Sequence, residues 1–287
     1  MAELLLLIGG GAAGVFGALL GLGGGLLIVP LLTLGFGLQL REAVGASLVC
    51  VIVTSSAAAS VYLQRDQANL RLGMTLEMFT ALAALAGGLV AFLLPEKLLA
   101  LMFAALLLYV AATMARGRAV ETGAYVGTAT PGAGSAAPGA APGEPTSADP
   151  SDGEGLAAAL SGPGYRVHSM GRGIAGSLLA GLVSALFGVG GGIVKVPIMN
   201  LVMGVPLRVA TATSNLMIGV TASAGALVYL FRGGIDPYVA APTAVGVFIG
   251  ASLAARLAHR VNLGFLRLLF GATLVFTALE MALQGMP

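Results

Sequence analysis

The feature that most constrains this chain is an internal repeat with a spacing of 167 residues. Gly21–Pro30 reads GLGGGLLIVP and Gly188–Pro197 reads GVGGGIVKVP, so both segments carry a glycine run followed by a proline. The similarity continues without a gap, and 24 of the 52 positions from residue 14 to residue 65 are identical in the second copy. Matched Pro, Arg, Ser and Tyr positions do not arise from an Ala- and Gly-rich composition. The repeat therefore predicts two homologous halves, an organisation typical of transporters.

Composition places both halves in a membrane. Hydrophobic residues make up 57% of the chain and charged residues only 9%, whereas a soluble domain carries about 25% charged residues. A helix that crosses a bilayer needs about 20 apolar residues. The apolar segments are 4–20, 25–37, 43–63, 74–94, 98–115, 173–187, 193–205, 209–231, 238–257 and 264–283. We expect an all-α polytopic membrane protein with the lipid bilayer as a partner.

The chain divides into three regions by composition. Residues 1–115 form the first membrane repeat and residues 171–287 the second. Residues 116–170 between them are rich in Gly, Ala, Pro and Ser, and such a composition cannot bury a core. We therefore interpret 116–170 as a flexible linker.

Two topologies are compatible with the repeat. If each glycine-broken segment crosses the membrane as one bent helix, each half has four crossings and the repeats are parallel. If each broken segment turns back as a re-entrant hairpin, three transmembrane helices follow it in each half and the repeats are inverted. The second topology places ten Lys and Arg residues on one side and three on the other, which fits the positive-inside rule better. We expect inverted repeats, a cytoplasmic linker 116–170 and both termini outside.

The two glycine runs are candidate anion sites. Each glycine costs a helix about 1 kcal/mol relative to Ala, so three in succession should break it. The half-helix that follows would then aim free N–H groups and about half a positive charge at the break. An anion is the natural ligand of such a position, although close helix packing of the GxxxG type is an alternative role for the glycines. The expected ligands are Gly23, Gly24, Gly25, Gly190, Gly191 and Gly192, with Gly21, Pro30, Gly188 and Pro197 as hinge residues.

A lysine follows the second glycine run, within the apolar segment. Lys195 corresponds to Ile28 in the first half, so the repeat itself does not require a charge there. A lysine at mid-bilayer costs about 2.5–3.5 kcal/mol and indicates a functional site. We expect Lys195 to neutralise the charge of a bound anion; the alternative is that it snorkels or pairs with a backbone carbonyl. Glu77 and Glu280 are interpreted as lying nearer helix ends, so a proton-relay carboxylate is not evident.

Hydroxyl and amide side chains add candidate ligands in the helix after each break. Ser47 and its counterpart Ser214, together with Asn215, are expected to contact the anion. The alternative is that such hydroxyls bond the carbonyl four residues earlier in their own helix. Tyr62 and Tyr229 lie beside arginines at segment ends and are interpreted as interfacial anchors.

Other classes of function are disfavoured by what the chain lacks. An intramembrane protease needs a Ser–His pair, paired Asp residues or an HExxH motif, and the apolar segments contain none of these. The single cysteine excludes a Cys-cluster metal site. We therefore expect no enzyme activity, no metal and no cofactor, and the net charge of +2 gives no reason to expect nucleic acid. The expected partners are a small anionic substrate and, as a coupling ion, protons; coupling to the substrate's own protonation and uncoupled transport are the alternatives, and the oligomeric state is left open.

The motifs resemble those of the sulfite exporter TauE/SafE family. The resemblance is carried by GLGGGLLIVPLL at Gly21–Leu32, FGVGGGIVKVPIM at Phe187–Met199, AVGASL at Ala43–Leu48 and ATATSN at Ala210–Asn215. It implies a multi-pass protein of the cell inner membrane that transports sulfur-containing anions such as sulfite or an organosulfonate.

The sequence and the resemblance together predict a secondary transporter, an exporter, that works by alternating access around a midplane site. The alternatives are an anion channel, which shares every feature above, and a transporter for another small anion such as thiosulfate or a carboxylate. The sequence does not distinguish import from export.

Overall fold

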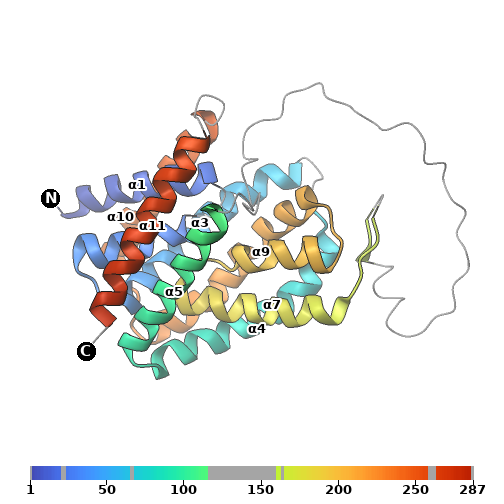
Figure 1. The fold of residues 1–287 in the computed structure, drawn as a ribbon, viewed down its shortest axis with the longest axis horizontal. Helices are drawn as coiled ribbons and strands as arrows, with labels where there is room; N and C mark the ends of the chain where they lie inside the picture. The colour runs from blue at the N-terminus through green and yellow to red at the C-terminus, as the bar shows by residue number, and fades with distance from the viewer. Residues whose placement is uncertain are drawn as a thin grey trace, which may run out of the picture.

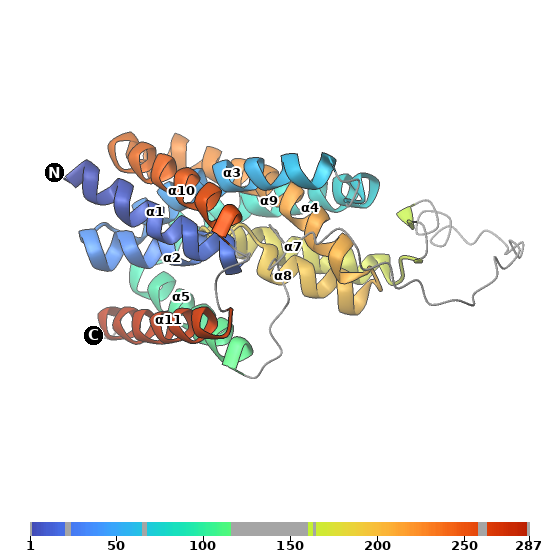
Figure 2. The same ribbon diagram turned by 90° about the horizontal axis from the view of Figure 1, so that it is seen from above.

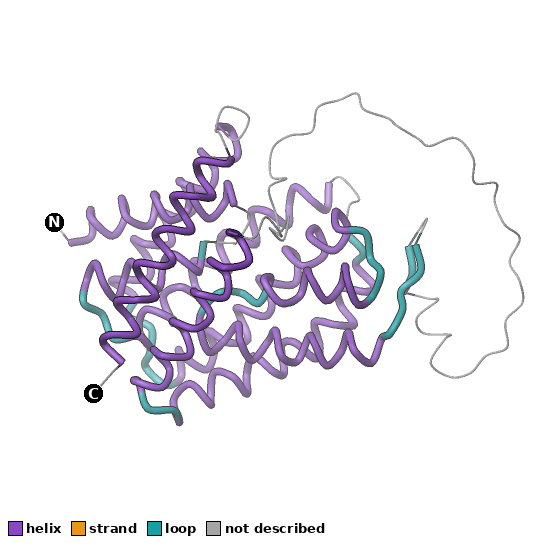
Figure 3. Tube along the Cα trace, viewed as in Figure 1, coloured by secondary structure: helices purple, strands orange, loops and turns teal. Residues whose placement is uncertain are grey.

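A computed structural model describes residues 2–20, 24–64, 68–115, 160–162, 165–257 and 263–285. Figure 3 shows helix along almost the whole of this described part. The helices of the first half are α1 (Ala2–Leu20), α2 (Gly25–Pro30), η1 (Leu31–Gly35), α3 (Leu40–Gln64), α4 (Leu70–Leu93) and α5 (Glu96–Ala115). Those of the second half are α7 (Met170–Phe187), α8 (Gly192–Pro197), η2 (Ile198–Val202), α9 (Leu207–Phe231), α10 (Pro237–Leu257) and α11 (Leu263–Gly285).

Several of these helices are suited to a bilayer. Within the described residues, 5 helices are long and apolar enough to cross a membrane, and they belong to α4, α5, α7, α9 and α10. Large apolar side chains such as Met78, Leu179 and Phe276 are exposed on the outside of the bundle. Lipid accounts for such exposure, since water would not favour it. The predicted all-α polytopic membrane fold is confirmed.

Both halves have the same order of elements. Each half contains a long helix, a glycine interruption, a six-residue α-helix that ends in proline, a five-residue π-helix and three further long helices. The π-helices begin directly after Pro30 and Pro197. Proline cannot donate a backbone hydrogen bond, and the wider π turn starts where that bond is missing. The proline that follows each glycine run therefore shapes the same local backbone twice.

Each half packs its first helix against the other half. Helix α1 lies along α10, and α7 lies along α4, while α3 packs on α9 and α5 on α11 (Figures 1 and 2). Gly14 of α1 lies so close to the Val247 carbonyl oxygen, and Gly181 of α7 so close to the Thr80 carbonyl oxygen, that a Cβ at either glycine would overlap that oxygen. Gly181 follows Gly14 by 167 residues and Val247 follows Thr80 by 167 residues, so the two contacts are equivalent in the repeat. Glycine permits this close helix contact without any polar side chain.

The first helices of the two halves enter the bundle from opposite sides. In Figure 1, α1 starts at the N-terminus on the left and runs toward the middle. Helix α7 starts on the right, next to residues 165–169, and runs toward the middle from that side. The C-terminal ends of α1 and α7, where the glycine runs begin, therefore both point into the centre of the molecule.

Candidate functional site

The second glycine run breaks the helix as the sequence predicts. Helix α7 ends at Phe187 and α8 begins at Gly192. Between them Gly188, Gly190 and Gly191 have φ angles of 69°, 78° and 73°. This left-handed backbone is open to glycine and costly for residues with a Cβ. The glycines are therefore required by the backbone of the break itself.

At the first break, the helix that follows the glycines begins in the same way as at the second break. Helix α1 ends at Leu20, α2 begins at Gly25, and Gly24 has a φ of 78°. The Gly24 carbonyl accepts from the N–H groups of Leu27 and Ile28, just as the Gly191 carbonyl accepts from those of Val194 and Lys195. The predicted roles of Gly21 and Gly23 fall outside the described residues.

The two breaks meet in the interior of the bundle. A Cβ at Gly25 would overlap the carbonyl oxygen of Gly188, so the two backbones are in contact. Ser47 of α3 is fully buried at this junction; its hydroxyl donates to the Gly188 carbonyl at 2.8 Å and lies 3.3 Å from the Gly25 carbonyl. Ser47 thus links the two breaks in this conformation, and its predicted contact with an anion stays a prediction.

Two buried hydroxyls border the second break without a hydrogen-bond partner among the described residues. They belong to Ser184 of α7 and Ser214 of α9. A Cβ placed on Gly191 would lie 3.3 Å from the Ser184 Cβ, and one on Gly192 would lie 3.6 Å from the Ser214 Oγ. An unsatisfied buried hydroxyl costs about 1–3 kcal/mol, and a bound oxyanion would accept its hydrogen bond. Ser214 was expected at the site.

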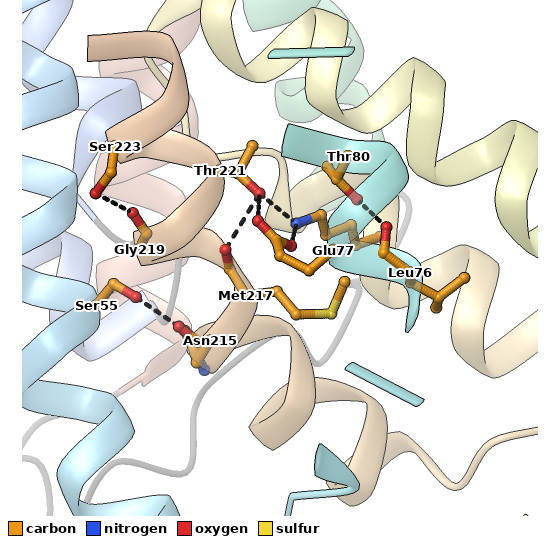
Figure 4. A network of polar contacts seen from close by, with 10 residues as sticks. Ser55, Leu76, Glu77, Thr80, Asn215, Met217, Gly219, Thr221 and Ser223 are labelled. Carbon is orange, nitrogen blue, oxygen red and sulfur yellow. Dashed lines mark hydrogen bonds and ion pairs between the residues drawn. The ribbon is translucent and has the colours of Figure 1, made fainter. Parts of the chain in front are cut away.

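Ser184 was missed by the sequence analysis. Its counterpart in the first half is Gly17, so the repeat gave no matched hydroxyl to notice. Asn215 is half-buried beside Ser214, and its backbone carbonyl accepts from the Ser55 hydroxyl at 2.5 Å (Figure 4). The role of the Asn215 side chain stays a prediction.

The alternative role for hydroxyls holds at other positions of the same helices. Thr54, Ser56 and Ser223 each donate to the carbonyl four residues earlier. These bonds satisfy the hydroxyl within its own helix. Neither Ser47 nor Ser214 makes such a bond, which separates the residues at the breaks from the others.

Lys195 is held in a buried network with an acidic partner, Glu77, and Figure 4 labels Glu77 and Thr221 of this network. Its ammonium Nζ lies 2.9 Å from Glu77 Oε2 and 2.7 Å from the Thr221 hydroxyl, and that hydroxyl is 2.6 Å from Glu77 Oε1. Lys195 is 2% exposed and Glu77 7% exposed. The three side chains come from α8, α4 and α9, so the network joins the first half to the second.

The interpretation of Glu77 as a residue near a helix end was wrong, and so was the alternative role for Lys195. Glu77 lies two turns into α4, with its side chain buried in the bundle, and is not free at a helix end. Lys195 neither snorkels nor pairs with a backbone carbonyl, because its ammonium forms an ion pair with the Glu77 carboxylate. The sequence could not show this pairing, since it depends on how α4 is placed against α8. A contact between Lys195 and a substrate stays a prediction.

Tyr229 also differs from its interpretation as an interfacial anchor. Its side chain is fully buried, its hydroxyl donates to the Ala185 carbonyl at 3.0 Å, and its ring centroid lies 5.1 Å from that of Phe92. It therefore links α9 to α7 and α4 inside the bundle. The side chain of Tyr62 lies outside the described residues.

Comparisons with known proteins agree with this architecture. The family model described as "Sulfite exporter TauE/SafE" matches residues 6–281. The "Probable membrane transporter protein YunE" of Bacillus subtilis (strain 168) is 23% identical over 295 residues, which cover 99% of each chain. No solved structure matches the chain significantly. The chain therefore belongs to the sulfite exporter TauE/SafE family and is a multi-pass membrane transporter, not an enzyme.

Proposed function

We propose that this protein is a secondary transporter of a small sulfur-containing anion, such as sulfite or an organosulfonate. The substrate binds where the two glycine breaks meet, and it is exported by alternating access. The observation that carries this proposal is the contact between the two breaks, with buried hydroxyls of Ser184 and Ser214 beside it that have no hydrogen-bond partner among the described residues.

The chemistry of the junction suits an oxyanion. Hydroxyl and amide groups donate hydrogen bonds while remaining neutral, so they can wait in an apolar bundle for a charged ligand. Hydrogen bonds from such donors to an ionised oxygen are about twice as strong as those between neutral groups. Ser184 and Ser214 supply such donors beside Gly191 and Gly192, we expect the Asn215 amide to add another, and a tetrahedral or pyramidal sulfur oxyanion offers several oxygens to accept them. The name of the family supports sulfur as the central atom.

Alternating access needs two halves that can move against each other around a common centre. We infer that the halves are inverted repeats, with the linker 116–170 in the cytoplasm and the protein in the cell inner membrane. Two observations support the inversion: α1 and α7 approach the centre from opposite sides (Figure 1), and the contacts of Gly14 and Gly181 are equivalent. Transporters with inverted repeats place their substrate site at the interface of the repeats.

Flux through purified protein in liposomes tests the substrate and the mode of transport. The anions to compare are sulfite, sulfoacetate, thiosulfate, sulfate and acetate as a carboxylate control. We expect saturable flux of a sulfur oxyanion and its exchange against a trans pool of the same anion. A preference for acetate would contradict the substrate class. Flux that never saturates and shows no exchange would indicate a channel instead.

Thiol labelling tests the topology with little interference from the native sequence. The single cysteine, Cys50, is buried, and a Cys50→Ala variant provides the background. A new cysteine after Ala2 should react with a membrane-impermeant maleimide added outside the cell, and one at Ser147 in the linker should not. The opposite pattern would contradict the proposed orientation.

A further inference from the structure

We propose that Glu77 is the proton-binding residue of the transporter and couples anion movement to proton movement. The proposal rests on the proposed function, because it assigns a coupling ion to the same transport cycle. In the cycle, the substrate anion replaces the Glu77 carboxylate as the partner of Lys195, and the released carboxylate takes up a proton.

The first support is the geometry of the network. One ammonium serves one carboxylate at 2.9 Å, and both groups are buried. A second anion cannot join Lys195 without leaving an excess negative charge in a medium of low dielectric constant, where charge is costly. Anion binding to Lys195 and ionisation of Glu77 therefore exclude each other.

The second support is the Thr221 hydroxyl, which joins both members of the pair. It accepts from Lys195 Nζ at 2.7 Å and lies 2.6 Å from Glu77 Oε1, to which it donates. The same hydroxyl lies 3.1 Å from the Met217 carbonyl. When Glu77 is protonated, the hydroxyl can turn its proton to Met217 and accept from the carboxyl group. Thr221 can thus stabilise both protonation states of Glu77 without leaving its place.

The third support is that the fold does not need the pair. The positions equivalent to Lys195 and Glu77 in the repeat are Ile28 and Ala244, and both are buried in the apolar core. The same backbone is therefore built once with apolar side chains and once with two charges. A buried ion pair gives weak net stability compared with well-packed apolar residues, whereas ionisable residues within membrane segments are typical of proton and ion pathways.

The charge balance fixes the stoichiometry. The resting pair, ammonium plus carboxylate, has no net charge. The loaded site, ammonium plus monovalent anion plus protonated Glu77, also has none. One proton is taken up at Glu77 Oε1, the oxygen beside the Thr221 hydroxyl, from the side on which the anion enters, and both are released together on the other side. Transport of a monovalent anion is therefore electroneutral symport, and the combined gradients of anion and proton set its direction.

The other charges near Glu77 in sequence and packing are basic residues at helix starts. The helices that meet around it carry Arg71 on α4, Arg172 on α7, Lys195 on α8 and Arg208 on α9. Arg71 and Arg172 are exposed in the first turns of their helices, and Arg208 also lies in a first turn. Among the side chains that the structure describes, it is Lys195 that forms an ion pair with Glu77, so the pair and the bound anion dominate the proton affinity of this carboxylate.

The test uses the full chain in liposomes with radiolabelled methanesulfonate, whose single negative charge does not titrate. At equal pH on both sides, labelled anion exchanges with unlabelled anion inside. With the outside more acidic by one unit and the membrane potential clamped at zero, wild-type protein should accumulate the anion up to about tenfold, the ratio of proton activities. Glu77→Gln should still exchange the anion but lose accumulation. Glu280→Gln, a half-buried carboxylate on α11, is the matched control and should accumulate as wild type does.

The outcomes separate this proposal from the proposed function. Wild-type protein that neither exchanges nor accumulates the anion contradicts the proposed function. Wild-type exchange without accumulation, or accumulation that survives Glu77→Gln, overturns the role of Glu77 alone. If Glu77→Gln does not fold, proton uptake by detergent-solubilised wild type decides: a pH dye should report about one proton bound per bound methanesulfonate, and binding without proton uptake overturns the proposal.

Discussion

The two halves are alike in backbone and unlike in chemistry. After each glycine run comes an α-helix that ends in proline and then a π-helix. Yet Lys195 follows the second run and is paired with Glu77 of the first half, whereas the equivalent positions around the first run are Ile28 and Ala244. The comparison teaches that glycine and proline positions build the paired breaks, whereas the charged chemistry is added to one of them. The backbone geometry that the two halves share and the charged pair at one break can therefore be tested separately.

The largest effect is expected from removing one member of the ion pair. Lys195→Met leaves the Glu77 carboxylate buried without its partner, which should lower the free energy of unfolding by about 3–5 kcal/mol. Ile28→Met introduces the same residue at the equivalent position. It keeps an apolar side chain of similar volume and should cost less than about 1.5 kcal/mol. Thermal unfolding in detergent measures both.

A double variant sharpens this result. Lys195→Met combined with Glu77→Gln removes both charges and should recover most of the stability lost in the single variant, because no unpaired charge remains buried. A double variant as unstable as Lys195→Met alone would show that the lysine side chain matters for packing and not for its charge.

A smaller and symmetric effect is expected where the helices approach closely. Gly14→Ala and Gly181→Ala each place a Cβ against a backbone carbonyl of the other half, so each should destabilise by about 1–3 kcal/mol. The two values should be similar, because the contacts are equivalent. Gly271→Ala on α11 is the control: nothing lies within 4 Å of the added Cβ, and the change should stabilise slightly. Unequal values for Gly14 and Gly181 would break the comparison between the halves.

The smallest effects on stability should come from the paired serines. Ser47→Ala loses a hydrogen bond to Gly188 and should cost about 1 kcal/mol. Ser214→Ala removes a buried hydroxyl that has no partner among the described residues, so it should cost no stability and should relieve part of the about 1–3 kcal/mol that the unsatisfied group costs. Its anion affinity should instead fall about tenfold, since a hydrogen bond to a charged group contributes about 1.5 kcal/mol. Equilibrium binding of radiolabelled sulfite checks this, and an unchanged affinity would exclude Ser214 from the site.

The helices and the breaks could be predicted because local residues determine them. Apolar runs set the helices, and a glycine run before a proline set each interruption, as Gly188–Pro197 illustrates. The ion pair could not be predicted because Glu77 and Lys195 lie on helices whose relative placement is a tertiary property. Tyr229 was misjudged for the same reason: an aromatic residue near a helix end looks interfacial until a neighbouring helix covers it.

The exchange of first helices between the halves has a consequence for biogenesis. Helix α1 leaves the ribosome long before its packing partner α10, and α7 is the element that completes the surroundings of α4. The first half is therefore inserted into the bilayer before the helices that pack against α1 and α4 have been made, and its assembly must wait for the second half to be synthesised. Fragments that end within the linker should be degraded when produced singly and rescued when produced together.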